Sequence, residues 1–139
     1  MFLYLLGAGT VTLGRGEVLL AQAGVLALGE QLVAVMLGEN GVRRSGGAKR
    51  LNDCLSEEQR VTLLKLSVVA PDVAGILQTY HSITVETVAR GRALAARCDS
   101  EFPDAMLEAT DAHLAREFGD AWVDLGSMPV APSASAPGT

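Results

Sequence analysis

The amino-acid sequence predicts an all-α protein, folded as a helical bundle of about five helices. Apolar residues recur every three or four positions rather than alternating, and no proline precedes Pro71. The chain has 139 residues, of which 49% are hydrophobic, so it can bury a core without disulfides or bound metals. We therefore expect one helical domain, covering residues 1–125.

The first two helices are expected at residues 2–13 and 17–37, with a Gly-Arg-Gly break between them. The second segment is apolar on most sides, which indicates a helix at the centre of the bundle. We expect neither segment to span a membrane. The first is too short, and the second contains Gln22, Glu30 and Gln31.

Each of the other three helices has a start signal. Ser56 followed by Gln59 forms the pattern of a capping box and predicts a helix at residues 56–66. A Pro-Asp pair opens each of the last two helices, at residues 71–98 and 103–118. On the longer of these, residues at alternating spacings of four and three predict one packing face: Val73, Leu77, Tyr80, Thr84, Thr87, Gly91, Leu94 and Cys98.

The end of the chain changes in character after the last helix. Trp122, the only tryptophan, is expected to cover the core there. Residues 126–139 carry no charge and are rich in Pro, Ala and Ser. We expect them to form a flexible tail outside the domain, because such a composition buries too little apolar surface to fold.

The charge balance and the metal-binding residue types exclude several classes of function. The chain has 11 basic and 16 acidic residues, a formal net charge of -5, which disfavours a stable complex with nucleic acid. Cys54 and Cys98 are far apart in the sequence and are expected to be reduced, which favours a cytoplasmic location. His81 and His113 have no His or Cys three or four residues away, so we expect no metal site.

Residues 38–52, between the second and third helices, hold the one concentration of positive charge. Arg43, Arg44, Lys49 and Arg50 occur there among several glycines. Cationic side chains beside exposed glycine amides can bind phosphate, so these four are the candidate nucleotide-binding residues. A solvated basic loop is the alternative, since the segment lacks the Gly-Lys-Ser/Thr ending of a Walker motif.

His81 is a second candidate for chemistry, beside Tyr80 on the long fourth helix. An imidazole titrates near neutral pH, so His81 could carry a proton in a substrate cleft. The alternative is a partly exposed histidine with a structural role. We find no complete set of catalytic residues in the sequence.

Three short motifs occur in a characteristic order. Arg-Gly-Glu at residues 15–17 precedes the long apolar helix, the basic loop ends Ala-Lys-Arg-Leu-Asn at residues 48–52, and Leu-Ser at residues 55–56 opens the next helix. This order resembles the helical C-terminal domain of bacterial nucleotidyltransferases of the aminoglycoside and lincosamide type, in the polymerase-beta-like superfamily. The resemblance covers about residues 1–118.

The resemblance implies a particular role for the chain. In that family the helical domain packs on a catalytic domain, closes the substrate cleft and often forms the dimer contact. It implies that Lys49 reaches the nucleotide phosphates and that Tyr80 lies at the substrate cleft. The chain lacks the family's catalytic pair, a Gly-Ser followed by an Asp-x-Asp, so ATP and magnesium are expected only with a missing or separate catalytic domain.

A second interpretation needs no catalytic domain. A small helical bundle can act as a protein-protein interaction module without enzymatic activity. The uncharged start at residues 1–6 and the apolar second helix would leave apolar surface exposed on an isolated domain. Under either interpretation we expect the chain to self-associate, most simply as a homodimer.

Overall fold

The computed structural model describes residues 1–43, 50–66 and 69–122. Within these residues the fold is all-α, as predicted, and contains no strand. The elements are α1 (Phe2–Gly14), α2 (Val18–Glu39), α3 (Leu51–Cys54), α4 (Glu57–Leu66), α5 (Val73–Arg97) and α6 (Asp104–Phe118), followed by a 3-10 turn, η1 (Gly119–Ala121). The tail predicted at residues 126–139 lies outside the described residues.

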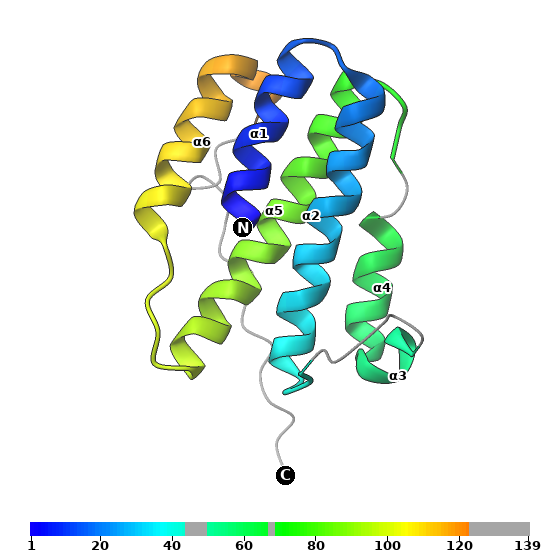
Figure 1. Cartoon of the computed structure of the whole chain (residues 1–139), viewed down its shortest axis with the longest axis vertical. Coiled ribbons are helices and arrows are strands. Elements are labelled where there is room, and N and C mark those ends of the chain that lie inside the picture. Colours follow the sequence, from blue (N-terminus) through cyan, green and yellow to red (C-terminus); the bar gives the residue numbers. More distant parts are fainter. Residues whose placement is uncertain (44–49, 67–68, 123–139) are drawn as a thin grey trace.

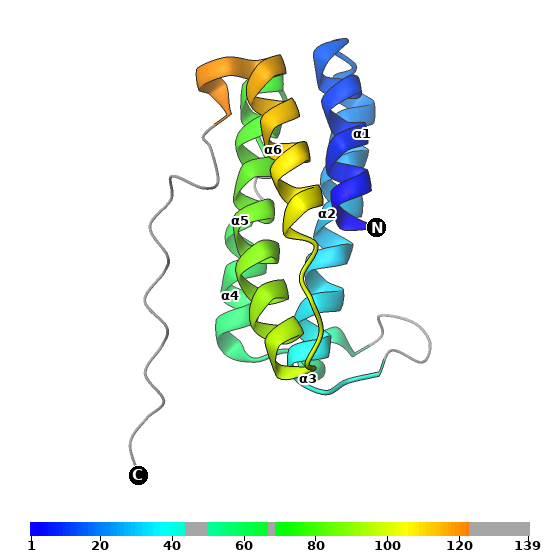
Figure 2. The ribbon, with the colours of Figure 1, turned by 90° about the vertical axis from the view of Figure 1, so that its left-hand side faces the viewer.

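The helices form a bundle in which α2 and α5 share the most extensive contact (Figure 1). Helices α1 and α2 form an antiparallel hairpin, and α6 packs beside α1. Turned by 90°, the molecule shows α1 and α2 on one side and α5 on the other (Figure 2). The short helix α4 has only a limited contact with α5. The bundle is therefore closely packed around α1, α2 and α5, and more open around α4.

The predicted start signals set the helix boundaries. Ser56 and Gln59 form the capping box: the Gln59 N–H donates to Ser56 Oγ at 3.2 Å, and the Ser56 N–H donates to Gln59 Oε1 at 2.9 Å. Asp72 is the N-cap of α5, and its carboxylate accepts a hydrogen bond from the Gly75 N–H at 2.7 Å. Helix α5 consequently begins at Val73, two residues later than predicted.

The sequence did not predict α3. This helix has four residues and lies at the end of the segment that we expected to be a basic loop. A single turn is too short to show an apolar period, so periodicity cannot detect it.

Tyr80 occupies the centre of the core. Its side chain is 1% exposed, and its hydroxyl donates a hydrogen bond to the Ala21 carbonyl at 3.0 Å. Tyr80 lies against Gly9 and Gly24: a Cβ atom would come within 2.3 Å of the ring at position 9 and within 2.1 Å of the hydroxyl oxygen at position 24. These glycines allow α1 and α2 to approach α5 closely.

The predicted packing face of α5 is buried at its centre and open at its end. Leu77, Tyr80, Thr84 and Thr87 are buried, as expected, whereas Cys98 is exposed and caps the helix. Trp122 is buried in the core, which confirms the role expected for it.

The outer side of α2 differs from the expectation of a central helix. Its inner side is fully buried, but Leu19 is 84% exposed and Leu26 is 74% exposed. The apolar composition of α2 therefore reflects one buried side and one exposed apolar side. Among the described helices, α2 is also long and apolar enough to cross a membrane, by length and composition alone.

Candidate functional site

Two of the four candidate phosphate-binding residues can be located. Arg43 and Arg50 are both exposed, on either side of residues 44–49. Arg44 and Lys49 lie outside the described residues. Neither Arg43 nor Arg50 forms an ion pair with another described residue.

The structure separates the two residues expected at a substrate cleft. Tyr80 is enclosed in the core, and burial raises the pKa of its hydroxyl above the ordinary value of 10.0. His81 is only partly buried and lies on another side of the same helix. Adjacent helical residues point about 100° apart, so neighbours in sequence face different surroundings.

His81 lies at a cleft between α4 and α5, whose lining mixes polar side chains with the apolar Leu66 and Val85. The cleft has a volume of about 290 Å³ and is also lined by Thr62, Lys65, Ser82 and Glu86. The Ser82 hydroxyl donates to the Gln78 carbonyl at 3.0 Å. A hydroxyl used in this way is not activated as a nucleophile, because activation requires a base that accepts its proton.

His81 also contacts Trp122. The ring centroids are 5.1 Å apart in an edge-to-face arrangement, and the indole N–H of Trp122 donates to Asp111 Oδ1 at 2.7 Å. An aromatic contact of this kind favours the structural role for His81. The described residues contain no group of three or more His, Cys, Asp or Glu that could hold a metal.

An ion-pair cluster that the sequence analysis did not identify joins α2, α4 and α5. Arg90 contacts Glu39 at 2.9 Å, Glu86 at 3.2 Å and also Glu58. Burial alone would lower the pKa of Arg90, but the adjacent Glu39 and Glu58 outweigh this effect and hold the pKa above its usual value. The spacing of four residues between Glu86 and Arg90 was the one sequence signal for this cluster.

A second set of polar contacts ties α4 to the end of α2. Besides capping α4, Gln59 donates to Glu39 Oε2 at 2.8 Å and accepts from Asn40 Nδ2 at 2.7 Å. Asn40 also donates to the Cys54 carbonyl at 2.8 Å. We call these side chains together with the Arg90 ion pairs the polar clamp. It connects the N-terminal end of α4 to the bundle through hydrogen bonds and charges.

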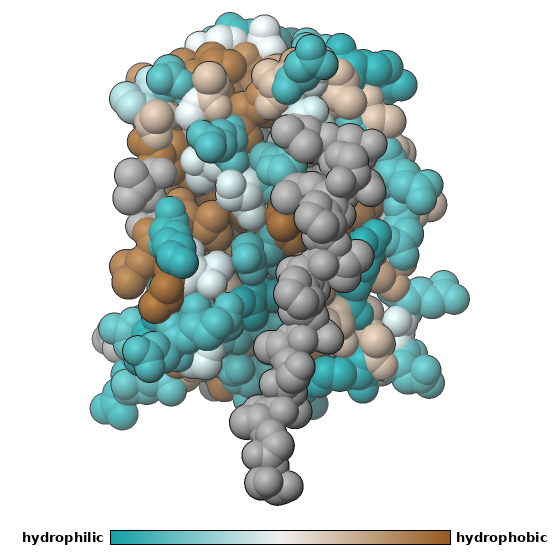
Figure 3. Space-filling view, turned by 180° about the vertical axis from the view of Figure 1, so that it is seen from behind, coloured by the Kyte–Doolittle hydropathy of each residue, from teal (hydrophilic) through white to brown (hydrophobic). Residues whose placement is uncertain are grey.

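The exposed side of the α1–α2 hairpin carries several large apolar side chains. On each helix, exposed residues recur at spacings of three and four, so they line the side that points away from the core. We call this surface the outer face: Tyr4, Ala8, Val11, Leu19, Leu20, Ala23 and Leu26. On the opposite side of the molecule, polar residues cover much of the lower half of the surface (Figure 3).

The fold and these surfaces define an all-α bundle with an exposed apolar face and without an assembled catalytic site among the described residues. No family model, curated protein or solved structure matches the chain.

Proposed function

We propose that the chain is a helical association module whose outer face pairs with the outer face of a second copy. The observation that carries this proposal is the exposure of large apolar side chains on one face of two neighbouring helices. Tyr4 is 67% exposed, and Leu19 and Leu26 are more exposed still. Soluble monomers rarely expose contiguous apolar patches of this kind, and such patches mark interaction sites.

The absence of charge on this face favours a second copy as the occupant. Helix α1 contains no charged residue, and α2 contains only Glu30 and Glu39. Glu39 belongs to the polar clamp, which leaves Glu30 near one end of the outer face and the exposed pair Arg15 and Glu17, of opposite charge, in the turn between the two helices. Two identical copies can therefore meet across a two-fold axis without opposing like charges, despite the net charge of -5 on each chain. Small residues at Ala8 and Ala23 allow the helices to approach.

The energy available from this contact is substantial. Burying one leucine-sized side chain contributes about 1.5 to 3 kcal/mol. In a two-fold dimer the same residue is buried on each of the two copies, so the two Leu19 side chains together contribute about 3 to 6 kcal/mol to association. A lysine at this position removes that contribution and places a positive charge of one copy near the same charge of the other. We therefore expect Leu19→Lys to raise the dissociation constant at least about 100-fold.

The test is sedimentation equilibrium of the wild type, Leu19→Lys and a matched control, Leu64→Lys. Leu64 is 70% exposed but lies on α4, away from the outer face. The wild type and the control should be dimeric, and Leu19→Lys monomeric with an unchanged helical spectrum. A wild type that stays monomeric at high micromolar concentration would contradict the proposal. So would a monomeric wild type that floats with phosphatidylcholine vesicles, since the outer face would then bind lipid.

The resemblance to nucleotidyltransferases supplies a second proposal, in which the chain is the non-catalytic helical portion of such a protein. What supports it is the order of elements: a long apolar α2, a basic connection, the short α3 and then a helix opened by Ser56. Under this second proposal, the isolated chain should transfer no nucleotide from ATP to an aminoglycoside or a lincosamide. Sequence upstream of Met1 would test the proposal directly, because it should encode the Gly-Ser and Asp-x-Asp pair. Upstream sequence without that pair would contradict the form of this proposal in which the catalytic domain belongs to the same chain.

A further inference from the structure

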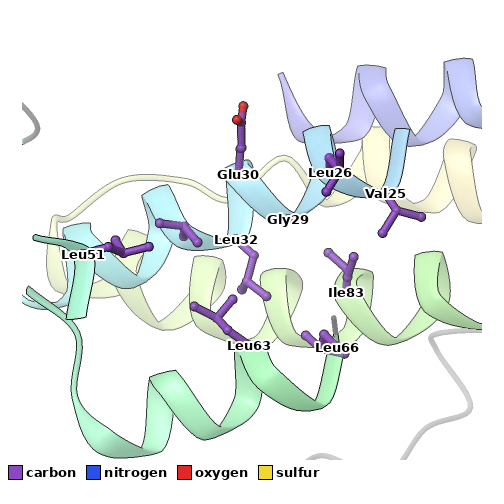
Figure 4. A pocket seen from close by; sticks show the side chains of 10 residues that line it. Val25, Leu26, Gly29, Glu30, Leu32, Leu51, Leu63, Leu66 and Ile83 are labelled. Carbon is purple, nitrogen blue, oxygen red and sulfur yellow. The ribbon is translucent and has the colours of Figure 1, made fainter. Parts of the chain in front are cut away.

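An apolar cavity separates α4 from α2, on the side of α2 that faces α4. It has a volume of about 350 Å³, and α5 contributes its floor through Ile83. In Figure 4, Leu32, Leu63, Leu66 and Ile83 converge on this space. The residues that line it are almost all apolar: Val25, Leu26, Gly29, Glu30, Leu32, Val33, Leu51, Leu63, Leu66 and Ile83.

The way in which α4 is held explains why this space is not filled. The polar clamp fixes the N-terminal end of α4 through Glu58 and Gln59. Farther along α4, Leu63 and Leu66 pack against the core but remain partly exposed. Hydrogen bonds and ion pairs therefore set the position of α4, and its apolar side chains do not close against α2.

Glycine at position 29 enlarges the cavity. Gly29 lies in the middle of α2, where a glycine weakens a helix relative to alanine. A Cβ atom built there would meet no atom within 4 Å, although the residue lines the cavity. Packing against the protein itself therefore does not require a glycine here, unlike at Gly24, which lies against Tyr80. The open position extends the cavity toward the α2 backbone.

The chemistry of the lining defines what the cavity can bind. Glu30 is the one charged residue in the lining, and Figure 4 shows its side chain directed away from the space between α2 and α4. A charged group inside the cavity would lose its hydration without gaining a partner, which is costly. The volume is at the lower end of the range for small-molecule sites, and Leu51 of α3 closes one end. A space of this volume suits a small molecule better than a long helix.

We propose that the cavity between α2 and α4 binds a small, uncharged, apolar molecule, aromatic or aliphatic in character. Its apolar body would lie among Leu32, Leu63, Leu66 and Ile83, against the backbone at Gly29. The cavity adjoins the outer face, because Leu26 belongs to both, but the four side chains that converge on the cavity do not belong to that face.

The test is a fluorescence titration with N-phenyl-1-naphthylamine, an uncharged apolar dye, and with its sulfonated analogue. The wild type should bind one molecule of the uncharged dye per chain, and the sulfonate at least about tenfold more weakly. Gly29→Ala adds one methyl group to the cavity and should weaken binding of the uncharged dye about fourfold. Gly29→Leu should weaken it by more than about tenfold.

The matched control is Gly7→Leu, because Gly7 is also a helical glycine with no atom within 4 Å of a built Cβ, but lies on α1. This control should bind the dye like the wild type. Both Gly29 variants should unfold at or above the wild-type temperature, so that lost binding reflects a filled cavity. The proposal is overturned if the wild type does not bind the uncharged dye in a saturable manner. It is also overturned if both Gly29 variants bind as the wild type does, or if the sulfonate binds equally well.

Discussion

The contact between Gly24 and Tyr80 permits a sharp test of how the core is packed. A Cβ atom at position 24 would lie 2.1 Å from the Tyr80 hydroxyl but 3.2 Å from the ring carbon that carries it. The steric conflict in Gly24→Ala is therefore with the hydroxyl oxygen. Removing that oxygen in Tyr80→Phe should relieve most of the conflict. The effects of the two substitutions on the free energy of unfolding should therefore not be additive.

The expected magnitudes follow from these contacts. Gly24→Ala should cost about 3 kcal/mol of overpacking, because Gly9 holds the ring from the other side, and should recover about 1 kcal/mol of helix propensity. Tyr80→Phe loses the hydrogen bond to Ala21, about 1 kcal/mol. Additive effects would sum to about 3 kcal/mol. The double variant should lose only about 1 kcal/mol, which gives a coupling of about 2 kcal/mol.

The assay is urea unfolding of the four proteins, followed by circular dichroism at one fixed low protein concentration, since association changes apparent stability. The control is Gly29→Ala, which should gain about 0.5 to 1 kcal/mol because its methyl group enters open space. A coupling energy below about 0.5 kcal/mol would refute the assignment of the conflict to the hydroxyl.

Three further predictions concern buried polar groups. Because burial raises the pKa of Tyr80, the hydroxyl loses its proton at a lower pH in the unfolded chain than in the folded one, and the free energy of unfolding should fall above about pH 10 by about 1.4 kcal/mol per pH unit. In urea titrations from about pH 9 to about pH 11, Tyr80→Phe should remove this part of the fall. Arg90→Met should lower the free energy of unfolding by about 2 kcal/mol, because it leaves Glu39 without its cationic partner, and adding Glu39→Gln should restore most of this loss. A double variant as unstable as the single one would contradict this. Trp122→Phe should cost about 1 kcal/mol or more in the same assay, through the lost hydrogen bond from the indole N–H to Asp111; a variant as stable as the wild type would contradict this.

The candidate site was less predictable from sequence than the fold. The sequence identified His81 and Tyr80 as neighbours on one helix, but the bundle places Tyr80 in the core and His81 at the α4–α5 cleft. The polar clamp was not predicted, because Glu39, Glu58 and Arg90 are far apart in the chain. Pairs at such separations leave no periodic signal, unlike the pair four residues apart on α5.

The sequence by itself determined the all-α class and most helix boundaries, because apolar period and caps act over a few residues. Ser56 and Gln59 cap α4 as predicted. Only the tertiary structure decided which apolar side chains are buried. Apolar residues occur on most sides of α2, yet Leu28 is buried and Leu19 is exposed. That difference depends on where α1 and α5 pack, and packing between distant segments is a property of the whole bundle, which local sequence does not encode.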